Sequence, residues 1–314
     1  MNKSKIKLLS DRGWERLLHE IVNGNVIPVI GSELFNVKID GEKMQLNEYI
    51  VKKMAEAINL ECSDTLDFTQ LTSKRYANLW DDIDSDPYYE TTQILKEMSN
   101  LQIEGSDALQ KLLSIDKFKL VLTTSFDDWA FRTMEGKWGV GNVRSLHYKK
   151  RSLEQDIDNL SVPTVYHMFG KSDVVPHSFV LTEDDLLEFL HYWLNDNYRP
   201  KRLANILREK YLLIIGCNYP NWLFRFFIQS IKCSSNTFSK NEFGMIADSK
   251  LDEELIAFIS RLDAQMHDNA VTFIDELVER WQKCYYQEIA KEIFISYASE
   301  DYDIASKIVD TFEK

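Results

Sequence analysis

The chain has 314 residues, of which 44% are apolar, so it can bury a sizeable core in two domains or in one large domain plus part of another. Its 37 basic and 50 acidic residues give a net charge of −13, which excludes general binding to a nucleic-acid backbone. The four cysteines contain no Cys-x-x-Cys pair, which argues against a zinc ribbon or another metal site.

The first half of the chain alternates between helical and strand patterns. Apolar residues at helical spacing predict helices over 11–22, 46–57 and 88–98, and a further helix that ends over 109–114. Short apolar runs predict strands over 26–30 and 119–123. Residues 64–86 are polar, aromatic and acidic, and no element is predicted there.

The second half continues this alternation. Strands are predicted over 164–168, 211–215 and 270–274, and helices over 182–194, 203–210, 221–231 and from 276 onwards. The run over 211–215 is wholly apolar, as expected of a central parallel strand. We therefore expect an α/β fold with a Rossmann-like, mainly parallel sheet flanked by helices.

The character of the sequence changes after Trp281. Residues 292–298 are predicted to form a strand, and an amphipathic helix is predicted from Ser299 towards Lys314. One strand and one helix bury too little surface to fold alone. We expect residues 1–285 to form one domain, and 286–314 to begin a second that continues in a longer protein.

Polar residues come directly after several of the predicted strands. The turn Thr123-Thr-Ser-Phe-Asp127 offers hydroxyl and carboxylate groups where α/β sheets bind ligands, at the carboxyl ends of strands. Ser125, Asp127 and His167 are the candidate catalytic residues. The candidate ligand-binding residues at these strand ends are Gly31, Ser32, Thr123, Thr124, Ser125, Asp127, Gly170, Gly216, Cys217 and Asn218. Gly31 lacks a Cβ, so its backbone could approach a phosphate.

Five strand-end segments occur in a recognisable order: Gly31-Ser-Glu-Leu, Thr123-Thr-Ser-Phe-Asp, His167-Met-Phe-Gly, Thr182-Glu-Asp-Asp and Gly216-Cys-Asn-Tyr-Pro-Asn-Trp. Together they resemble the sirtuin-like (SIR2-like) NAD-binding domains of bacterial antiphage defence proteins. The tail Ile293-Phe-Ile-Ser-Tyr-Ala-Ser-Glu-Asp resembles the first strand and loop of a Toll/interleukin-1 receptor (TIR) domain. The resemblance implies NAD or ADP-ribose as the ligand.

Two positions depart from the family pattern. Ser125 stands where the family has an asparagine that positions the ribose and the attacking water, and Phe169 stands where it has the general-base histidine. His167 lies two residues before Phe169, so alternation would put both on one strand face, about 6–7 Å apart. That distance is too long for a simple substitution. Glu33 would also place a carboxylate near any pyrophosphate.

Three hypotheses follow. In the first, the sirtuin-like domain has lost hydrolysis and serves as scaffold, sensor or oligomerisation platform for a NAD-cleaving TIR domain. In the second, it is itself a NAD glycohydrolase with an altered site. In the third, it is a non-catalytic module that binds a phage protein or a nucleotide signal through the acidic 64–90 region. The expected partners are further copies of the chain and a phage protein as trigger, with neither nucleic acid nor membrane. The expected compartment is the cytoplasm.

Overall fold

A computed structural model of the chain describes residues 9–39, 41–61, 67–73, 75–81, 86–98, 106–147, 157, 160–172, 178–217, 221–232, 244–248, 253–261, 265–291, 302, 304, 306 and 307. Within them, seven strands form one parallel sheet in the order β5-β6-β4-β1-β7-β8-β9, and two form an antiparallel hairpin, β2-β3. The predicted α/β fold with a mainly parallel sheet is confirmed.

The sheet strands are β1 (Val26–Ile30), β4 (Leu120–Thr123), β5 (Arg144–His147), β6 (Thr164–His167), β7 (Tyr211–Ile215), β8 (Gly244–Ala247) and β9 (Gln265–His267). The hairpin consists of β2 (Asn36–Ile39) and β3 (Glu42–Gln45). Strand β1 lies at the centre, between β4 and β7. The chain moves outwards on the β4 side first and then crosses to β7, so the topological switch point lies beyond the carboxyl end of β1.

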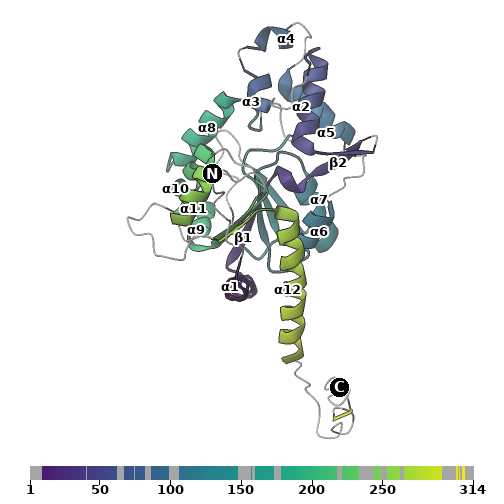
Figure 1. Ribbon diagram of the computed structural model, residues 1–314, viewed down its shortest axis with the longest axis vertical. Helices are drawn as coiled ribbons and strands as arrows, with labels where there is room; N and C mark the ends of the chain where they lie inside the picture. Colours follow the sequence, from purple (N-terminus) through teal and green to yellow (C-terminus); the bar gives the residue numbers. More distant parts are fainter. Residues whose placement is uncertain are drawn as a thin grey trace.

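Helices cover both faces of the sheet (Figure 1). The longer helices are α1 (Asp11–Val22), α2 (Leu46–Ala57), α5 (Pro87–Met98), α6 (Ser106–Leu113), α7 (Trp129–Trp138), α8 (Glu183–Leu194), α9 (Lys201–Glu209), α10 (Asn221–Lys232), α11 (Glu253–Arg261) and α12 (Ala270–Lys291). Shorter turns are η1 (Ser32–Leu34), α3 (Phe68–Leu71) and α4 (Ala77–Asp81). The largest core cluster joins α1, α2, α6, α7 and α12 to one face, and a second joins α8–α11 to the other.

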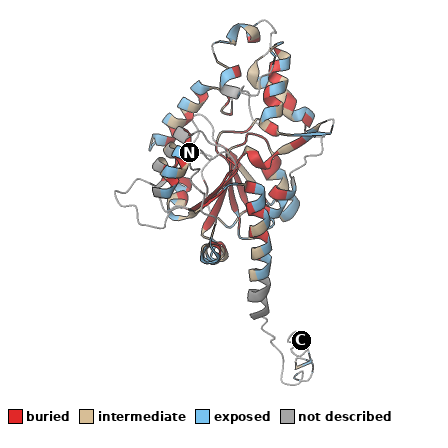
Figure 2. Ribbon diagram, in the orientation of Figure 1, coloured by how far each residue is buried: buried red, intermediate tan, exposed pale blue. Residues whose placement is uncertain are grey.

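The strands of the sheet carry buried apolar residues on both faces. Figure 2 shows that the central sheet is mostly buried. In β1, Ile27 and Val29 belong to the core under α8–α11, while Val26 and Ile30 belong to the opposite core. Burial on both faces explains the continuous apolar runs of the central strands. None of the helices among the described residues combines the length and apolarity needed to cross a membrane.

One predicted strand is wrong. Residues 270–274 open the helix α12 instead, and the strand before it is β9. The side-chain oxygen of Asn269 accepts the backbone N–H of Thr272 at 2.9 Å and so caps the first turn. The buried residues of α12 recur at helical spacing: Ala270, Phe273, Ile274, Leu277, Val278 and Trp281. A short apolar run does not by itself distinguish a strand from the start of a buried helix.

The carboxyl-terminal prediction stays a prediction. The strand expected over 292–298 lies outside the described residues, as does most of the helix expected over 299–314. The proposed domain boundary at residue 285 falls inside α12, which runs to Lys291.

Candidate functional site at the carboxyl edge of the sheet

The turn after β4 is closed by its own hydrogen bonds. The hydroxyl of Ser125 donates to one carboxylate oxygen of Asp127, and the other oxygen accepts the backbone N–H of Trp129 at 2.8 Å. The N–H of Ser125 in turn donates to the Thr123 hydroxyl at 3.1 Å. Asp127 therefore supports the first turn of α7, and both predicted reactive side chains have partners within the turn.

Burial accompanies these bonds. Ser125 is 5% exposed and Asp127 is 4% exposed. Burial raises the pKa of the Asp127 carboxyl, although the hydrogen bonds from Ser125 and Trp129 act in the opposite direction. The carboxyl is therefore a better base than an ordinary aspartate would be, but it lies where water has little access.

The third candidate, His167, is at the end of β6 and is fully buried. Its Nδ1 lies 3.4 Å from the carbonyl oxygen of Ser125, and its register partners are Thr123 on β4 and His147 on β5. The structure therefore brings all three candidate catalytic residues together. In this arrangement the histidine contacts the backbone of the turn.

Phe169 lies on the other side of the sheet from the face that alternation predicts. Strand β6 ends at His167, and the turn that follows contains Gly170 with φ +86°. Phe169 packs against Phe189 of α8, with ring centroids 5.2 Å apart, whereas Val165 of the same strand belongs to the opposite core. The period of two ends with the strand, so His167 and Phe169 do not share a face.

Gly31 lies where the ends of the neighbouring strands β1 and β7 approach each other closely. A Cβ at Gly31 would lie 2.3 Å from the Cα of Cys217, so the missing side chain lets the ends of β1 and β7 meet. The Gly31 N–H donates to Ile215 and the Glu33 N–H donates to Gly216. These two amides are therefore engaged by the β7 turn, and a phosphate would have to displace those bonds to reach them.

The remaining predicted nucleotide residues surround the same edge. Gly216 has φ +61°, and a Cβ there would lie 2.7 Å from the Cβ of Glu33. Cys217 is buried, with its thiol 3.5 Å from the carbonyl oxygen of Val29. Ser32 belongs to η1, and the Thr124 N–H donates to the Ile30 carbonyl. Asn218 lies outside the described residues.

Helix α5 and an aromatic cluster cover this edge, which the sequence does not predict. The ring of Phe179 lies 4.9 Å from Phe126 and 5.5 Å from Tyr88. The Tyr88 hydroxyl donates to Asp185 at the start of α8, 97 residues away in sequence. The Thr92 hydroxyl donates to the Tyr88 carbonyl within α5 at 2.8 Å and lies 3.4 Å from the carbonyl oxygen of Ser172, whose N–H donates to the Phe126 carbonyl. These contacts hold α5 across the carboxyl edge.

The pKa of Asp185 is shifted in the opposite direction to that of Asp127. Burial alone would raise its pKa, but hydrogen bonds from the Tyr88 hydroxyl and from the amides of Thr182 and Leu181 outweigh burial and lower it. Asp185 stays ionised and closes the capping box of α8 with Thr182. Its role in this structure is to join α5 to α8.

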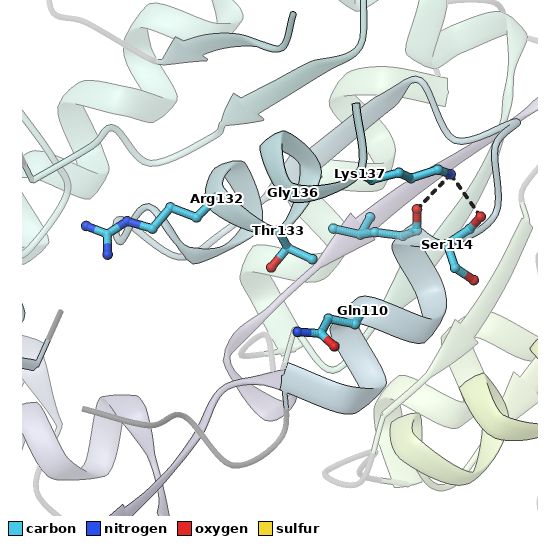
Figure 3. A pocket seen from close by; sticks show the side chains of 7 residues that line it. Gln110, Ser114, Arg132, Thr133, Gly136 and Lys137 are labelled. Atoms are coloured by element: carbon cyan, nitrogen blue, oxygen red, sulfur yellow. Dashed lines mark hydrogen bonds between the residues drawn. The ribbon is translucent and has the colours of Figure 1, made fainter. Parts of the chain in front are cut away.

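The cavity beside Asp127 is small. It has a volume of about 110 Å³ and is lined by Thr92, Leu95, Lys96, Asp127, Asp128, Trp129, Arg132 and Ser172. Ligand pockets usually measure about 300–1,000 Å³. A cavity of about 580 Å³ between α6 and α7 has the required size, but it lies on the flank of the molecule, with Gln110, Thr133 and Arg132 around it (Figure 3). The cavity beside Asp127 is therefore too small to hold a dinucleotide.

The match with known families covers most of this edge. Residues 119–266 match the family described as a SIR2-like domain. The match runs from β4 into β9 and includes Ser125, Asp127, His167 and Phe169, while Gly31 precedes it. A comparison with curated proteins finds no match. Among the described residues, no group of three or more histidines, cysteines and acids is arranged to hold a metal ion.

Proposed function

We propose that the SIR2-like domain is a non-hydrolysing module of an antiphage defence protein, acting as scaffold, sensor or oligomerisation platform. NAD cleavage then belongs to a TIR domain that starts within 286–314 and is completed in a longer form of the protein. Two observations support this proposal: the family match over 119–266, and the resemblance of the tail to the start of a TIR domain.

The observation that carries the proposal is the closed turn after β4. A general base must reach the water or hydroxyl that it deprotonates, at about 2.6–3.2 Å or through one water. Asp127 already accepts bonds from Ser125 and Trp129, and His167 is fully buried. The position of the family's base is occupied by Phe169, whose ring packs on α8. A phenyl ring cannot accept a proton.

The direct test measures NAD loss with the 314-residue chain and with a longer protein that carries the complete TIR domain. The proposal expects no cleavage by the 314-residue chain at any protein concentration, and cleavage by the longer protein when it is clustered. Cleavage by the 314-residue chain that Ser125→Ala or His167→Ala abolishes would overturn the proposal. Asp275→Asn is the matched control, because Asp275 pairs with Lys111 on the surface.

A gain-of-function experiment tests the same site from the other direction. The double variant Ser125→Asn with Phe169→His restores both the amide and the base of the family pattern. We expect measurable NAD cleavage only when both substitutions are present, because the water must be positioned and also deprotonated. Each single variant serves as a control. Unfolding curves must show that the double variant still folds, since Phe169 loses its contact with Phe189.

One observation favours the altered-site hydrolase as the second candidate. The Ser125 hydroxyl donates to a carboxylate whose pKa is raised by burial, a pairing that could deprotonate the hydroxyl if the site opened. In that case Asp127→Asn would abolish cleavage by the 314-residue chain while its fold is retained. An unchanged background rate in Asp127→Asn would exclude this candidate.

Self-association is part of the proposal. Helix α8 exposes two leucines one heptad apart, Leu187 at 62% and Leu194 at 59%, and Tyr198 follows at 45%. Exposed apolar residues at this spacing are typical of a contact surface. We expect the double variant Leu187→Glu with Leu194→Glu to reduce the molar mass measured in solution to that of a monomer. A wild-type chain that is monomeric at all concentrations would contradict this part. The proposed trigger is a phage protein.

A further inference from the structure

The amino edge of the sheet, opposite the candidate site, contains a second cavity. Its volume is about 460 Å³, and it lies below the starts of β1 and β4 and beside the end of α1. The lining residues are Val22, Asn23, Gly24, Val26, Ile27, Asp116, Lys117, Lys119, Leu120, Trp138, Leu160 and Lys210. The volume falls within the range of small-molecule pockets, about 300–1,000 Å³.

The charge of this lining is opposite to that of the whole chain. It carries three lysines and one aspartate, although the chain has a net charge of −13. Within the described part of the chain, the ammonium groups of Lys117 and Lys119 make no hydrogen bond or ion pair, and both side chains are exposed. Two adjacent cations without a carboxylate partner would attract a dianion.

Several helices of this fold end at the amino edge of the sheet. The carboxyl end of a helix carries a partial negative charge, which would repel such an anion. Two lysines offset these ends. The ammonium of Lys137 donates to the carbonyls of Leu113 and Ser114 at the end of α6 (Figure 3), and Lys210 donates to the carbonyl of Gly24 after α1. Lys117 and Lys119 are not used in this way, so their charges are available to a ligand.

Trp138 lines the same cavity. The indole Nε1 of Trp138 is buried and has no hydrogen-bond partner among the residues that the structure describes. Because this nitrogen has almost no solvent-accessible surface, other atoms of Trp138 border the cavity. Asp116 adds one acceptor that could receive a hydroxyl group.

We infer that this cavity, which we name the amino-edge pocket, binds a small phosphate monoester that also carries hydroxyl groups. Lys117 and Lys119 would face the dianionic phosphate, as lysine does when it binds phosphate as a point charge. Asp116, which also lines the cavity, would accept a hydrogen bond from a sugar hydroxyl. A phosphate ion alone would leave most of the volume empty, since one water occupies about 30 Å³. The site is separate from the NAD site expected at the carboxyl edge.

Calorimetric titration of the 314-residue chain tests this pocket with four probes: adenosine monophosphate, ribose 5-phosphate, inorganic phosphate and succinate. We expect ribose 5-phosphate and adenosine monophosphate to bind with Kd of about 1 mM or below at low salt. Inorganic phosphate should bind more weakly. The affinity should fall about tenfold or more in Lys117→Gln with Lys119→Gln, and it should fall with added salt.

The matched control is Lys53→Gln with Lys283→Gln, which removes two lysine charges elsewhere, both from surface ion pairs. This variant should bind like the wild type, within about twofold. Three results would overturn the inference: no binding of either sugar phosphate at millimolar concentration, equal weakening in the control variant, or succinate binding as tightly as the phosphates. Adenosine monophosphate binding without ribose 5-phosphate binding would place recognition on the base and overturn the hydroxyl-phosphate assignment.

Discussion

The two edges of one parallel sheet differ in how their polar groups are satisfied. At the carboxyl edge, Ser125 and Asp127 bond to each other, and α5 and an aromatic cluster cover them. At the amino edge, Lys117 and Lys119 are exposed beside a cavity of about 460 Å³. Polar residues at strand ends are therefore available to a ligand only where the fold leaves them without internal partners.

This contrast has an energetic counterpart. Groups at the carboxyl edge are bonded and buried, so removing one leaves its partner without a bond in a place that water cannot easily reach. Groups at the amino edge are solvated, so removing one should affect ligand binding and leave stability nearly unchanged. Unfolding measurements on matched variants can sharpen or break the comparison.

The largest expected effect on stability is where the ends of the neighbouring strands β1 and β7 meet. In Gly31→Ala the new Cβ would lie 2.3 Å from the Cα of Cys217, and a backbone atom cannot rotate away. We expect the free energy of unfolding in denaturant to fall by about 3 kcal/mol. Gly136→Ala is the control, because no atom outside its own helix lies within 4 Å of that position, and it should be neutral or stabilising. Equal stability of both variants would contradict this close approach of β1 and β7.

The next effect is at the closed turn. Asp127→Ala removes the acceptor of the Ser125 hydroxyl and of the Trp129 amide, so we expect a loss of about 2 kcal/mol in the free energy of unfolding. Asp128→Ala removes only a surface pair with Arg132 and should cost less than about 0.5 kcal/mol. If the two variants are equally stable, the turn is not held by Asp127.

A smaller effect, with a pH dependence, is expected where α5 meets α8. Tyr88→Phe removes the hydrogen bond to Asp185 and should cost about 1 kcal/mol near neutral pH. The lowered pKa of Asp185 contributes stability that is present above its ordinary value of 3.8 and is lost as pH falls through the lowered native value. Tyr88→Phe should therefore lose less stability than the wild type on acidification. Parallel pH dependences would show that Tyr88 does not set this pKa.

The smallest effect is expected at the amino-edge pocket. Lys117→Gln with Lys119→Gln should change the free energy of unfolding by less than about 0.5 kcal/mol, because neither ammonium has a partner within the described residues. Thermal and denaturant unfolding of the variant and the wild type would test this. A loss of more than about 1 kcal/mol would mean that these lysines are structural, and the contrast between the edges would fail.

Much of the fold could be predicted because local sequence patterns indicate its strands and helices. The apolar runs at β1, β4, β6 and β7 and the helical spacing of α1, α2 and α8 are strong signals. The hairpin β2-β3 was missed although the sequence contains Asp40-Gly41, a hairpin dipeptide, between its strands. Strands β5, β8 and β9 were missed; β5 and β9 contain only one apolar residue each, so no apolar run marks them.

The candidate site was predicted in part. Sequence order placed Ser125, Asp127 and His167 at the carboxyl edge, and the structure brings them together. It could not predict the cover over them, because the bond between Tyr88 and Asp185 joins residues 97 positions apart and no local pattern encodes it. The lysines of the amino-edge pocket were missed for the same reason: Lys119 and Lys210 meet only through the register of β1 with its neighbours.

Helix α12 is fixed to the body of the molecule at its first turns. Trp14 stacks on Phe273 at 5.3 Å, and Arg280 lies over the Trp14 ring, so the first three turns of α12 are fixed to the body. The 22-residue helix is about 33 Å long, and its far end extends away from the sheet (Figure 1). The length of a straight helix fixes how far the following residues lie from the sheet, and its turns fix the direction in which they leave it. Inserting one residue after Trp281 would turn everything beyond it by about 100° and advance it by only about 1.5 Å.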